Sequence, residues 1–222
     1  MNKVLPFGAM LVGTIFLGLT FSQSREEKRI SSSIDVFNTT APDIPDSILK
    51  KAQGIAVIPS VVELGAGVTG MRGQGVITVR KDDGCWSDPV FITVKGGSVG
   101  LQAGGRSSDI TFVFTTKESI KKLRDGEMLL GTDASVGTGP VNKRAGTKVL
   151  SDIYTYTRNR GAYVGASLNG STLRVDSNAN ANYYNANDIS GEDIFEGKVS
   201  NVPPGASEFL KEVSAKLGKC KK

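Results

Sequence analysis

The chain of 222 residues contains no histidine, only two cysteines and a single tryptophan. A nucleophilic serine or cysteine normally needs a base within hydrogen-bond reach, and histidine is the usual one. The missing histidine therefore excludes a Ser-His-Asp triad and a Cys-His pair. Two distant cysteines also cannot supply the four ligands of a structural zinc site, and no D-x-[DN]-x-[DN]-G calcium loop occurs. We expect a protein that is not an enzyme and that uses no metal or other cofactor.

The N-terminus has the form of an export signal. A short basic start precedes the uncharged run Val4–Phe21, and Thr20, Ser22 and Ser24 are small residues at cleavage-compatible spacing. We expect residues 1–24 to be a signal peptide, which would place the mature protein in the periplasm or cell envelope. The alternative is an uncleaved membrane anchor, for which the run is at the lower limit of length.

Export would bring the two cysteines into an oxidising compartment, where they could pair. Cys85 lies in a predicted turn and Cys220 lies in the basic tail, so both are expected at the surface. Sequence does not tell whether their Cα atoms come within disulfide distance. A Cys85–Cys220 disulfide and two unpaired thiols both remain open.

The composition fits one globular domain with a real core, at 39% hydrophobic and 22% charged residues. We divide the chain into the signal, a polar linker over residues 25–45, a domain over residues 46–200, and a C-terminal helix with a basic tail over residues 201–222. The linker is predicted because Arg25–Thr40 shows no clear apolar periodicity.

Short β-type runs separated by glycine dominate the predicted domain. Val76–Val79 and Val90–Val94 should form a hairpin that turns at Asp83-Gly84. Asn169-Gly170 predicts a second hairpin, and the polar stretch around Tyr183 is predicted to be a loop. We expect an α+β fold, mainly antiparallel β, as a compact barrel or sandwich-like domain with a few short peripheral helices.

Three helices are predicted around these strands. The first begins at Asp46 and ends before Gly54, and the second follows a capping box formed by Thr115 and Glu118. The third is the C-terminal helix, whose apolar residues recur at helical spacing. Its apolar stripe is expected to dock on the domain more readily than on a membrane.

The segment Gly65–Gly70, "GAGVTG", matches the G-x-G-x-x-G pattern of dinucleotide sites. That pattern binds a phosphate only where a helix begins directly after it. Here a glycine-broken and then β-branched segment follows, so no helix is expected. We interpret these glycines as bends between strands.

Seven segments follow one another along the chain: "AQGIAVIP", "GQGVITVR", "GCWSDPVFITVKGGSVGLQAG", "DITFVF", "LLGTDASVGTGP", "YTRNRGAYVGASLNGSTL" and "NANYY". Together they resemble the SYLF domain, known as a lipid-binding domain in bacteria and an actin-binding domain in fungi. The resemblance runs from about Ala52 to Tyr184. It implies that the segment around Trp86 is a strand–turn–strand signature with a structural tryptophan.

The resemblance implies binding to membrane lipid. Relatives bind phosphoinositides through a basic amphipathic N-terminal helix, and some fungal ones bind and bundle actin. Here the corresponding region is a predicted signal and linker, and an exported protein would not meet cytoplasmic actin. We therefore expect adsorption to an anionic phospholipid or membrane surface.

Two sets of residues are candidates for the lipid site. The predicted helix before the first strand offers Lys50 and Lys51 beside apolar Ile48 and Leu49. Basic side chains attract anionic headgroups, at about 1 kcal/mol each near a charged surface. The competing interpretation is that the apolar pair docks this helix on the β core and that the lysines form a solvated face.

The second set lies in a basic loop and comprises Lys143, Arg144 and Lys148. A further alternative is a structural or protein-interaction module of the envelope that does not bind lipid directly. Nucleic acid is not expected as a partner, because the basic residues are scattered.

Asp109, Asp133 and Asp152 could be considered as catalytic carboxylates, but their spacing does not argue for it. Asp133 is expected to accept a hydrogen bond from the backbone in a turn.

Overall fold

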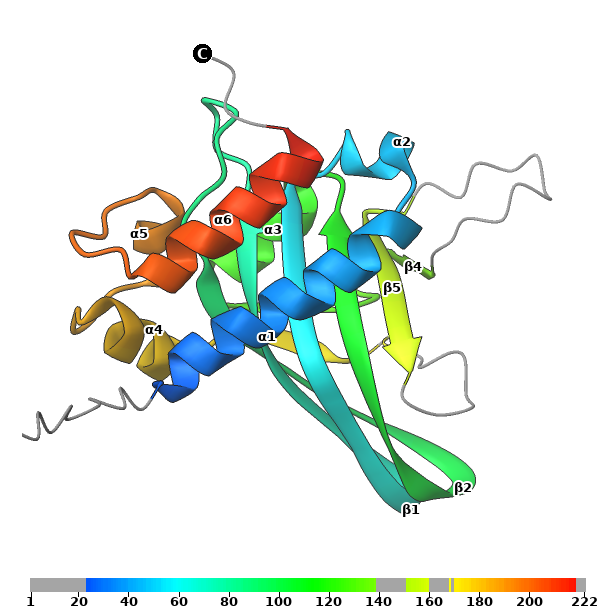
Figure 1. Ribbon diagram of the computed structural model, residues 1–222. Helices are drawn as coiled ribbons and strands as arrows, with labels where there is room; N and C mark the ends of the chain where they lie inside the picture. Colours follow the sequence, from blue (N-terminus) through cyan, green and yellow to red (C-terminus); the bar gives the residue numbers. More distant parts are fainter. Residues whose placement is uncertain (1–22, 139–150, 160–167, 169, 219–222) are drawn as a thin grey trace, which may run out of the picture.

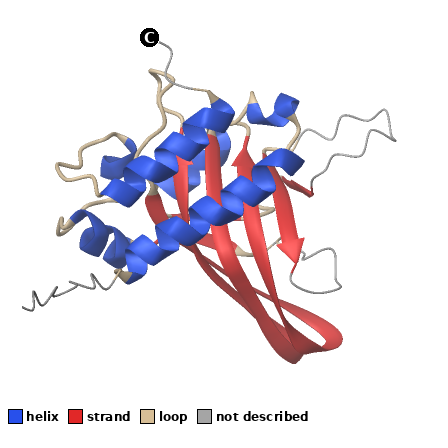
Figure 2. Ribbon diagram, in the orientation of Figure 1, coloured by secondary structure: helices blue, strands red, loops and turns tan. Residues whose placement is uncertain are grey.

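The protein is described by a computed structural model that covers residues 23–138, 151–159, 168 and 170–218. The described helices, in chain order, are α1 (Arg25–Thr40), the 3-10 helix η1 (Ala41–Asp43), α2 (Asp46–Leu49), α3 (Glu118–Arg124), α4 (Ser177–Tyr184), α5 (Gly191–Phe195) and α6 (Pro204–Leu217). The described strands are β1 (Gly54–Val79), β2 (Val90–Phe114), β3 (Glu127–Leu129), β4 (Val136–Thr138), β5 (Ile153–Asn159) and β6 (Thr172–Val175). Figure 2 shows the helices gathered outside the layer of strands.

β1 and β2 form one long antiparallel ribbon. Gly54 pairs with Phe114 at one end, and Ile77 pairs with Val90 at the other. The ribbon bends double at its free tip (Figure 1), so β1 consists of two limbs. We call residues 54–66 the first limb and residues 68–79 the second limb. The predicted hairpin is thereby confirmed, but it is one end of a much longer ribbon.

The doubled ribbon organises a six-stranded sheet in the order β3-β6-β2-β5-β4, with β1 paired to β2. The beginning of β2 pairs with β6 and its end pairs with β5, both antiparallel. β4 and β5 form the parallel pair among the described strands. The fold is therefore α+β with a curled, mainly antiparallel sheet and short peripheral helices, as the sequence predicts.

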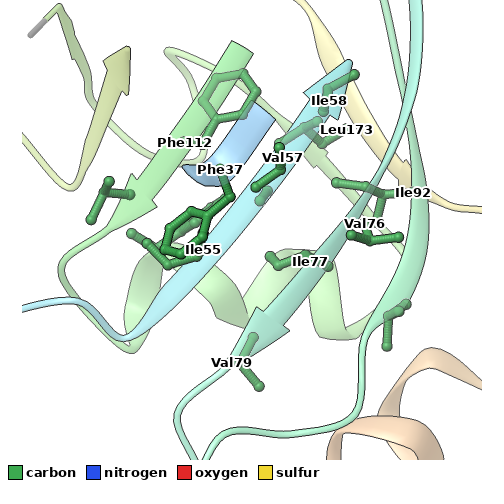
Figure 3. Close-up of a cluster of buried hydrophobic side chains, with 14 of the residues drawn as sticks. Phe37, Ile55, Val57, Ile58, Val76, Ile77, Val79, Ile92, Phe112 and Leu173 are labelled. Atoms are coloured by element: carbon green, nitrogen blue, oxygen red, sulfur yellow. The ribbon is translucent and has the colours of Figure 1, made fainter. Parts of the chain in front are cut away.

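The core lies between the first limb, the second limb and α1. The side chains of residues 55–58 are all fully buried, so both faces of the first limb are covered. Figure 3 shows Phe37 of α1 beside Ile55, with Val76 and Ile77 of the second limb on the other side. A strand buried on both faces reads as a continuous apolar run rather than an alternating one, which explains the "IAVI" segment.

The predicted linker over residues 25–45 is wrong, because the structure forms α1 and η1 there. Ile30, Ser33, Phe37 and Thr40 are buried at helical spacing on one face of α1. Two of them are hydroxyl residues, which diluted the apolar pattern. Each hydroxyl donates to the carbonyl four residues earlier and can therefore be buried without loss of a hydrogen bond.

The predicted loop around Tyr183 is also wrong, because it is helix α4. Asp176 caps this helix by accepting a hydrogen bond from the Ala179 backbone N–H at 3.3 Å. Buried Asn180 accepts from the Phe91 backbone N–H, and the Tyr184 hydroxyl donates to the Pro89 carbonyl. The polar composition of α4 serves contacts with the start of β2, which a local pattern could not reveal.

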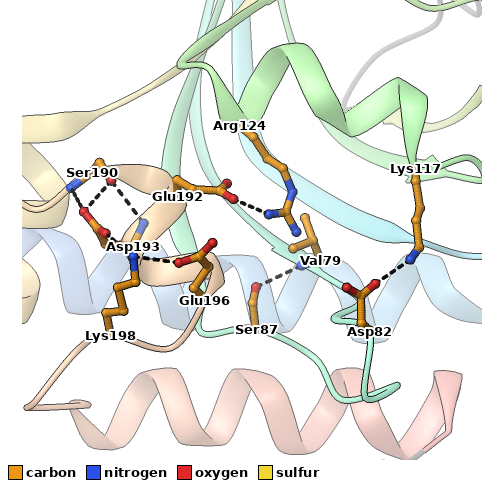
Figure 4. Close-up of polar contacts among 10 residues, drawn as sticks. All are labelled: Val79, Asp82, Ser87, Lys117, Arg124, Ser190, Glu192, Asp193, Glu196 and Lys198. Atoms are coloured by element: carbon orange, nitrogen blue, oxygen red, sulfur yellow. Dashed lines mark hydrogen bonds and ion pairs between the residues drawn. The ribbon is translucent and has the colours of Figure 1, made fainter.

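The segment between β1 and β2 is structural, as the SYLF resemblance implies. Trp86 is 7% exposed and forms an isolated antiparallel bridge with Arg80, whose guanidinium lies 4.6 Å from the indole ring. The Ser87 hydroxyl accepts from the Val79 backbone N–H at 3.1 Å (Figure 4). Gly84 has φ +79° in the turn that precedes them, consistent with the predicted Asp83-Gly84 turn.

α6 docks on the domain beside α1 (Figure 1) and buries Phe209, Val213 and Leu217. This confirms the predicted C-terminal helix and its packing.

On the neighbouring part of the surface, Arg124 of α3 forms an ion pair with Glu192 of α5 at 2.6 Å (Figure 4). Within the part of the chain that the structure describes, none of the helices has the length and apolarity needed to cross a membrane.

Candidate interaction groove

The predicted lipid helix does not present its apolar pair to solvent. Ile48 and Leu49 are 9% and 8% exposed and belong to the core, whereas Lys50 and Lys51 are exposed. The apolar pair docks α2 on the domain, as the competing interpretation held. A membrane could therefore meet the two lysines here but not the apolar side chains that were expected to insert.

The other predicted site residues lie largely outside the described residues. This holds for Lys143, Arg144, Lys148 and Cys220. Cys85 lies in the turn between β1 and β2 and is not a free thiol. Because its expected partner is not described, the Cys85–Cys220 pairing stays a prediction.

A different surface has the features of a binding site. An open groove of about 770 Å³ lies between the N-terminal half of α1 and the two limbs of β1. This volume is in the range of ligand pockets, about 300–1,000 Å³. We call it the β1 groove, and its lining comprises Arg25, Lys28, Arg29, Ser32, Pro59, Ser60, Val62, Leu64, Gly70, Met71, Arg72, Gly73 and Gln74.

One wall of the β1 groove is basic. Arg25 and Lys28 are three residues apart, as are Arg29 and Ser32, and Arg29 follows Arg25 by four residues. These spacings place the four side chains on one face of α1. Ser24 caps this helix by accepting from the Glu27 backbone N–H at 3.0 Å. The Ser-x-x-Glu pattern at 24–27 is a capping signature that marks the start of this helix, and it was overlooked in the sequence.

The other wall comes from β1 and is partly apolar. Val62 and Leu64 are 41% and 61% exposed. They lie two residues apart and so project from the same face of the first limb. Glu63 between them projects to the other face, where it forms an ion pair with Arg106 directly opposite on β2. Arg72 adds a further basic side chain from the second limb.

Arg29 is the residue of the basic wall whose side chain is held in place by contacts with β2 and with Asp176. Its guanidinium donates to the Asp176 carboxylate at 2.9 Å and to the Ile92 carbonyl, and it lies 5.1 Å from the Phe91 ring centroid. Burial lowers the pKa of Arg29 from its ordinary value, and the Asp176 hydrogen bond opposes that shift. Arg29 thus ties α1 to β2 and to the residue that caps α4.

The charged side chains that line the groove are all positive. Its lining contains four basic residues and no aspartate or glutamate. Among the described residues, Arg25, Lys28 and Arg72 take part in no ion pair. A groove with uncompensated positive charge favours an acidic ligand and speeds its diffusional encounter.

The three carboxylates considered for catalysis hold local structure. Asp109 accepts from the Ser60 backbone N–H at 2.8 Å, and Asp133 accepts from the Leu129 backbone N–H at 2.7 Å, in the turn expected for it. Asp152 accepts from the hydroxyl and the backbone N–H of Ser135, which lower the pKa of its carboxyl group. Within the described residues, no cluster of acidic or cysteine side chains is arranged to hold a metal ion.

Comparison with known proteins agrees with the order of the motifs. Residues 95–216, more than half of the chain, match the family described as "Ysc84: Las17-binding protein actin regulator". The chain belongs to the Ysc84 (SYLF) family. No solved structure matches the chain.

Relatives of this Ysc84-family chain occur in fungi and vertebrates. Protein YSC84 of Saccharomyces cerevisiae is 32% identical over 76% of this chain and 37% of its own length. LAS seventeen-binding protein 3 of the same yeast is 30% identical, over 75% and 37%. SH3 domain-containing YSC84-like protein 1 of Rattus norvegicus is 31% identical, over 81% and 54%. The chain thus spans between about a third and about half of the length of these relatives.

Proposed function

We propose that this chain is a non-enzymatic protein-binding module of the cell envelope and that its partner docks in the β1 groove. The observation that carries the proposal is the groove itself. It joins a basic helix face to exposed apolar side chains. Three of its four basic residues, Arg25, Lys28 and Arg72, form no ion pair with the described residues. Interfaces commonly combine apolar contact with charge complementarity of this kind.

The names of the relatives support a protein as the partner class. The family description and the name of one yeast relative both refer to binding of Las17. Because the chain spans only part of those relatives, we carry over the class of partner and not its identity.

A photo-crosslinking experiment in the producing cells tests this function. A photo-reactive residue replaces Arg72 in the groove or, as a control, Lys122 on α3, where the side chain is also exposed. We expect one discrete protein adduct from position 72, its loss when Lys28→Glu is added, and no such adduct from position 122. Adducts of equal yield from both positions, or from neither, would contradict the proposal.

Adsorption to an anionic membrane is the second candidate, and a specific observation favours it. Val62, Leu64 and Val68 are 41%, 61% and 68% exposed and cluster at the bend of the β1–β2 ribbon. Exposed apolar residues beside basic ones are typical of surfaces that enter a lipid interface. The apolar contact would then come from the ribbon and not from α2.

Vesicle co-sedimentation separates the two candidates. If the ribbon binds membrane, phosphatidylglycerol vesicles should retain the protein and neutral vesicles should not, and salt should weaken binding because headgroup attraction is screened. Leu64→Asp with Val68→Asp should then release the protein. If both kinds of vesicle leave it in solution, the membrane candidate fails and the protein partner remains.

Location in the envelope rests on the N-terminal run and has its own test. Residues 1–22 are outside the described part of the chain. If the signal is cleaved, the intact mass of the exported protein corresponds to a chain that begins within a few residues of Gln23. A mass that still includes Lys3 would show a membrane anchor instead.

A further inference from the structure

We infer that the β1 groove takes an extended peptide segment in which acidic and apolar residues alternate. This inference rests on the proposed function and goes beyond it, because it names the chemistry and the backbone conformation of the segment that docks. The argument comes from the two walls of the groove and from the geometry of an extended chain.

The basic wall fixes one half of the pattern. Arg25, Lys28, Arg29 and Ser32 occupy one face of α1 within a stretch of eight residues, a length of about 10 Å at 1.5 Å per residue. Arg29 is held by Asp176, whereas Arg25 and Lys28 are exposed and form no ion pair on the described surface. Side chains that face this wall should therefore be carboxylates.

The strand wall fixes the other half. Val62 and Leu64 are exposed into the groove from alternate positions of the first limb, and Met71 of the second limb lines it as well. The side chains of a strand alternate between its two faces and repeat every two residues, about 6.6 Å. Side chains that face this wall should be apolar and should repeat with the same spacing.

An extended segment satisfies both walls at once. Its successive side chains point to opposite sides, so one set meets α1 and the other set meets β1. A helical segment would need its acidic and apolar residues at spacings of three and four. The two-residue spacing of Val62 and Leu64 matches the extended pattern. The open shape of the groove leaves the ends of such a segment free to continue into the rest of the partner.

Three labelled peptides of equal composition test the pattern by fluorescence anisotropy. They contain glutamate and valine in strict alternation, in two separate blocks, or in a helical order. We expect the alternating peptide to bind more tightly than the other two. Equal binding of the blocked peptide would show attraction by charge alone, and tightest binding of the helical order would show a helical ligand; either result overturns the inference.

Groove variants and matched controls locate the binding. Lys28→Glu with Arg72→Glu, and separately Leu64→Asp, should weaken binding of the alternating peptide about tenfold or more. The charge control is Lys121→Glu with Lys122→Glu on α3, and the apolar control is Val202→Asp, where the native valine is 37% exposed. Both controls should bind as the parent does, and thermal melting should show that all variants fold.

The outcomes separate this inference from the function on which it rests. If position 72 gives a protein adduct in cells but none of the three peptides binds, the alternating ligand is wrong and the docking groove stands. If the control variants weaken peptide binding as much as the groove variants do, the peptide binds elsewhere and the inference is overturned.

Discussion

Gly75 of the second limb of β1 lies against Val57 of the first limb. A Cβ added at Gly75 would overlap the carbonyl oxygen of Val57 and lie 2.7 Å from the Cα of Ile58. The two limbs can cross here because position 75 has no side chain. This crossing sets the distance between the limbs that line the β1 groove.

The first prediction concerns this crossing. Gly75→Ala should lower the free energy of unfolding by about 1–3 kcal/mol or more, because the methyl group meets backbone that cannot move aside. Gly70→Ala is the matched control, since a Cβ at Gly70 meets no atom within 4 Å. Its effect should stay within about 0.5 kcal/mol. Urea unfolding measures both, and equal values would show that the limbs do not approach as described.

A second prediction concerns the contact of α4 with β2. The Asn180 side chain accepts from the Phe91 backbone N–H at 2.8 Å and donates to the Phe91 carbonyl at 3.4 Å, and it is fully buried. Asn180→Ala leaves a buried N–H without a partner and should cost about 1–3 kcal/mol. The exposed neighbour Asn178, changed to alanine, is the control in the same denaturation experiment. A loss no greater than that of the control would mean that α4 is not anchored at Phe91.

The third prediction is a pH dependence. Hydrogen bonds from Ser135 lower the pKa of Asp152 in the folded protein. The stabilisation is therefore present above the unfolded pKa of about 3.9 and is lost as pH falls through the folded pKa. Asp152→Asn should be less stable than the parent at neutral pH, and the gap should narrow below about pH 4. A gap that stays constant with pH would contradict this role; Asp35→Asn, at an exposed position of α1, serves as the control.

The fourth prediction is the Cys85–Cys220 disulfide. The Arg80 guanidinium donates to the Gly84 carbonyl and to the Leu217 carbonyl, both at 3.1 Å, and so holds the end of α6 beside the turn that contains Cys85. Cys220 follows Leu217 by three residues in the sequence, and three extended residues span about 10 Å at most. This length of chain is enough for Cys220 to reach the turn that contains Cys85. Mass spectrometry of a non-reduced digest should find the two cysteines in one cross-linked fragment. If both cysteines of the unfolded, non-reduced protein react fully with a thiol-labelling reagent, the disulfide is excluded.

Sequence predicted those parts of the fold that depend on neighbouring residues. The turn at Gly84, the strands around it and the stripe of α6 carry local signals, and all three are present. α1 was missed because Ser33 and Thr40 stand at buried positions where an apolar residue was expected. The doubling of the β1–β2 ribbon depends on contacts such as Gly75 with Val57, which no local pattern reports.

In the candidate site too, local sequence signals predicted some features, and features that depend on long-range packing were missed. Lys50 and Lys51 were predicted as surface basic residues and are exposed, but the burial of Ile48 and Leu49 depends on packing that the sequence did not resolve. The β1 groove joins residues 25–32 to residues 59–74. Once α1 was interpreted as a linker, its basic face could not be placed next to β1.

Backbone amide chemical shifts of the isotope-labelled protein, followed during titration with the alternating glutamate–valine peptide, test the central claim most directly. We predict that the shifts that change lie in residues 25–32 of α1 and in residues 60–64 and 70–74 of β1. Changes centred on α3 or α5, or a spectrum that stays the same at saturating peptide, would contradict the assignment of the β1 groove as the binding surface.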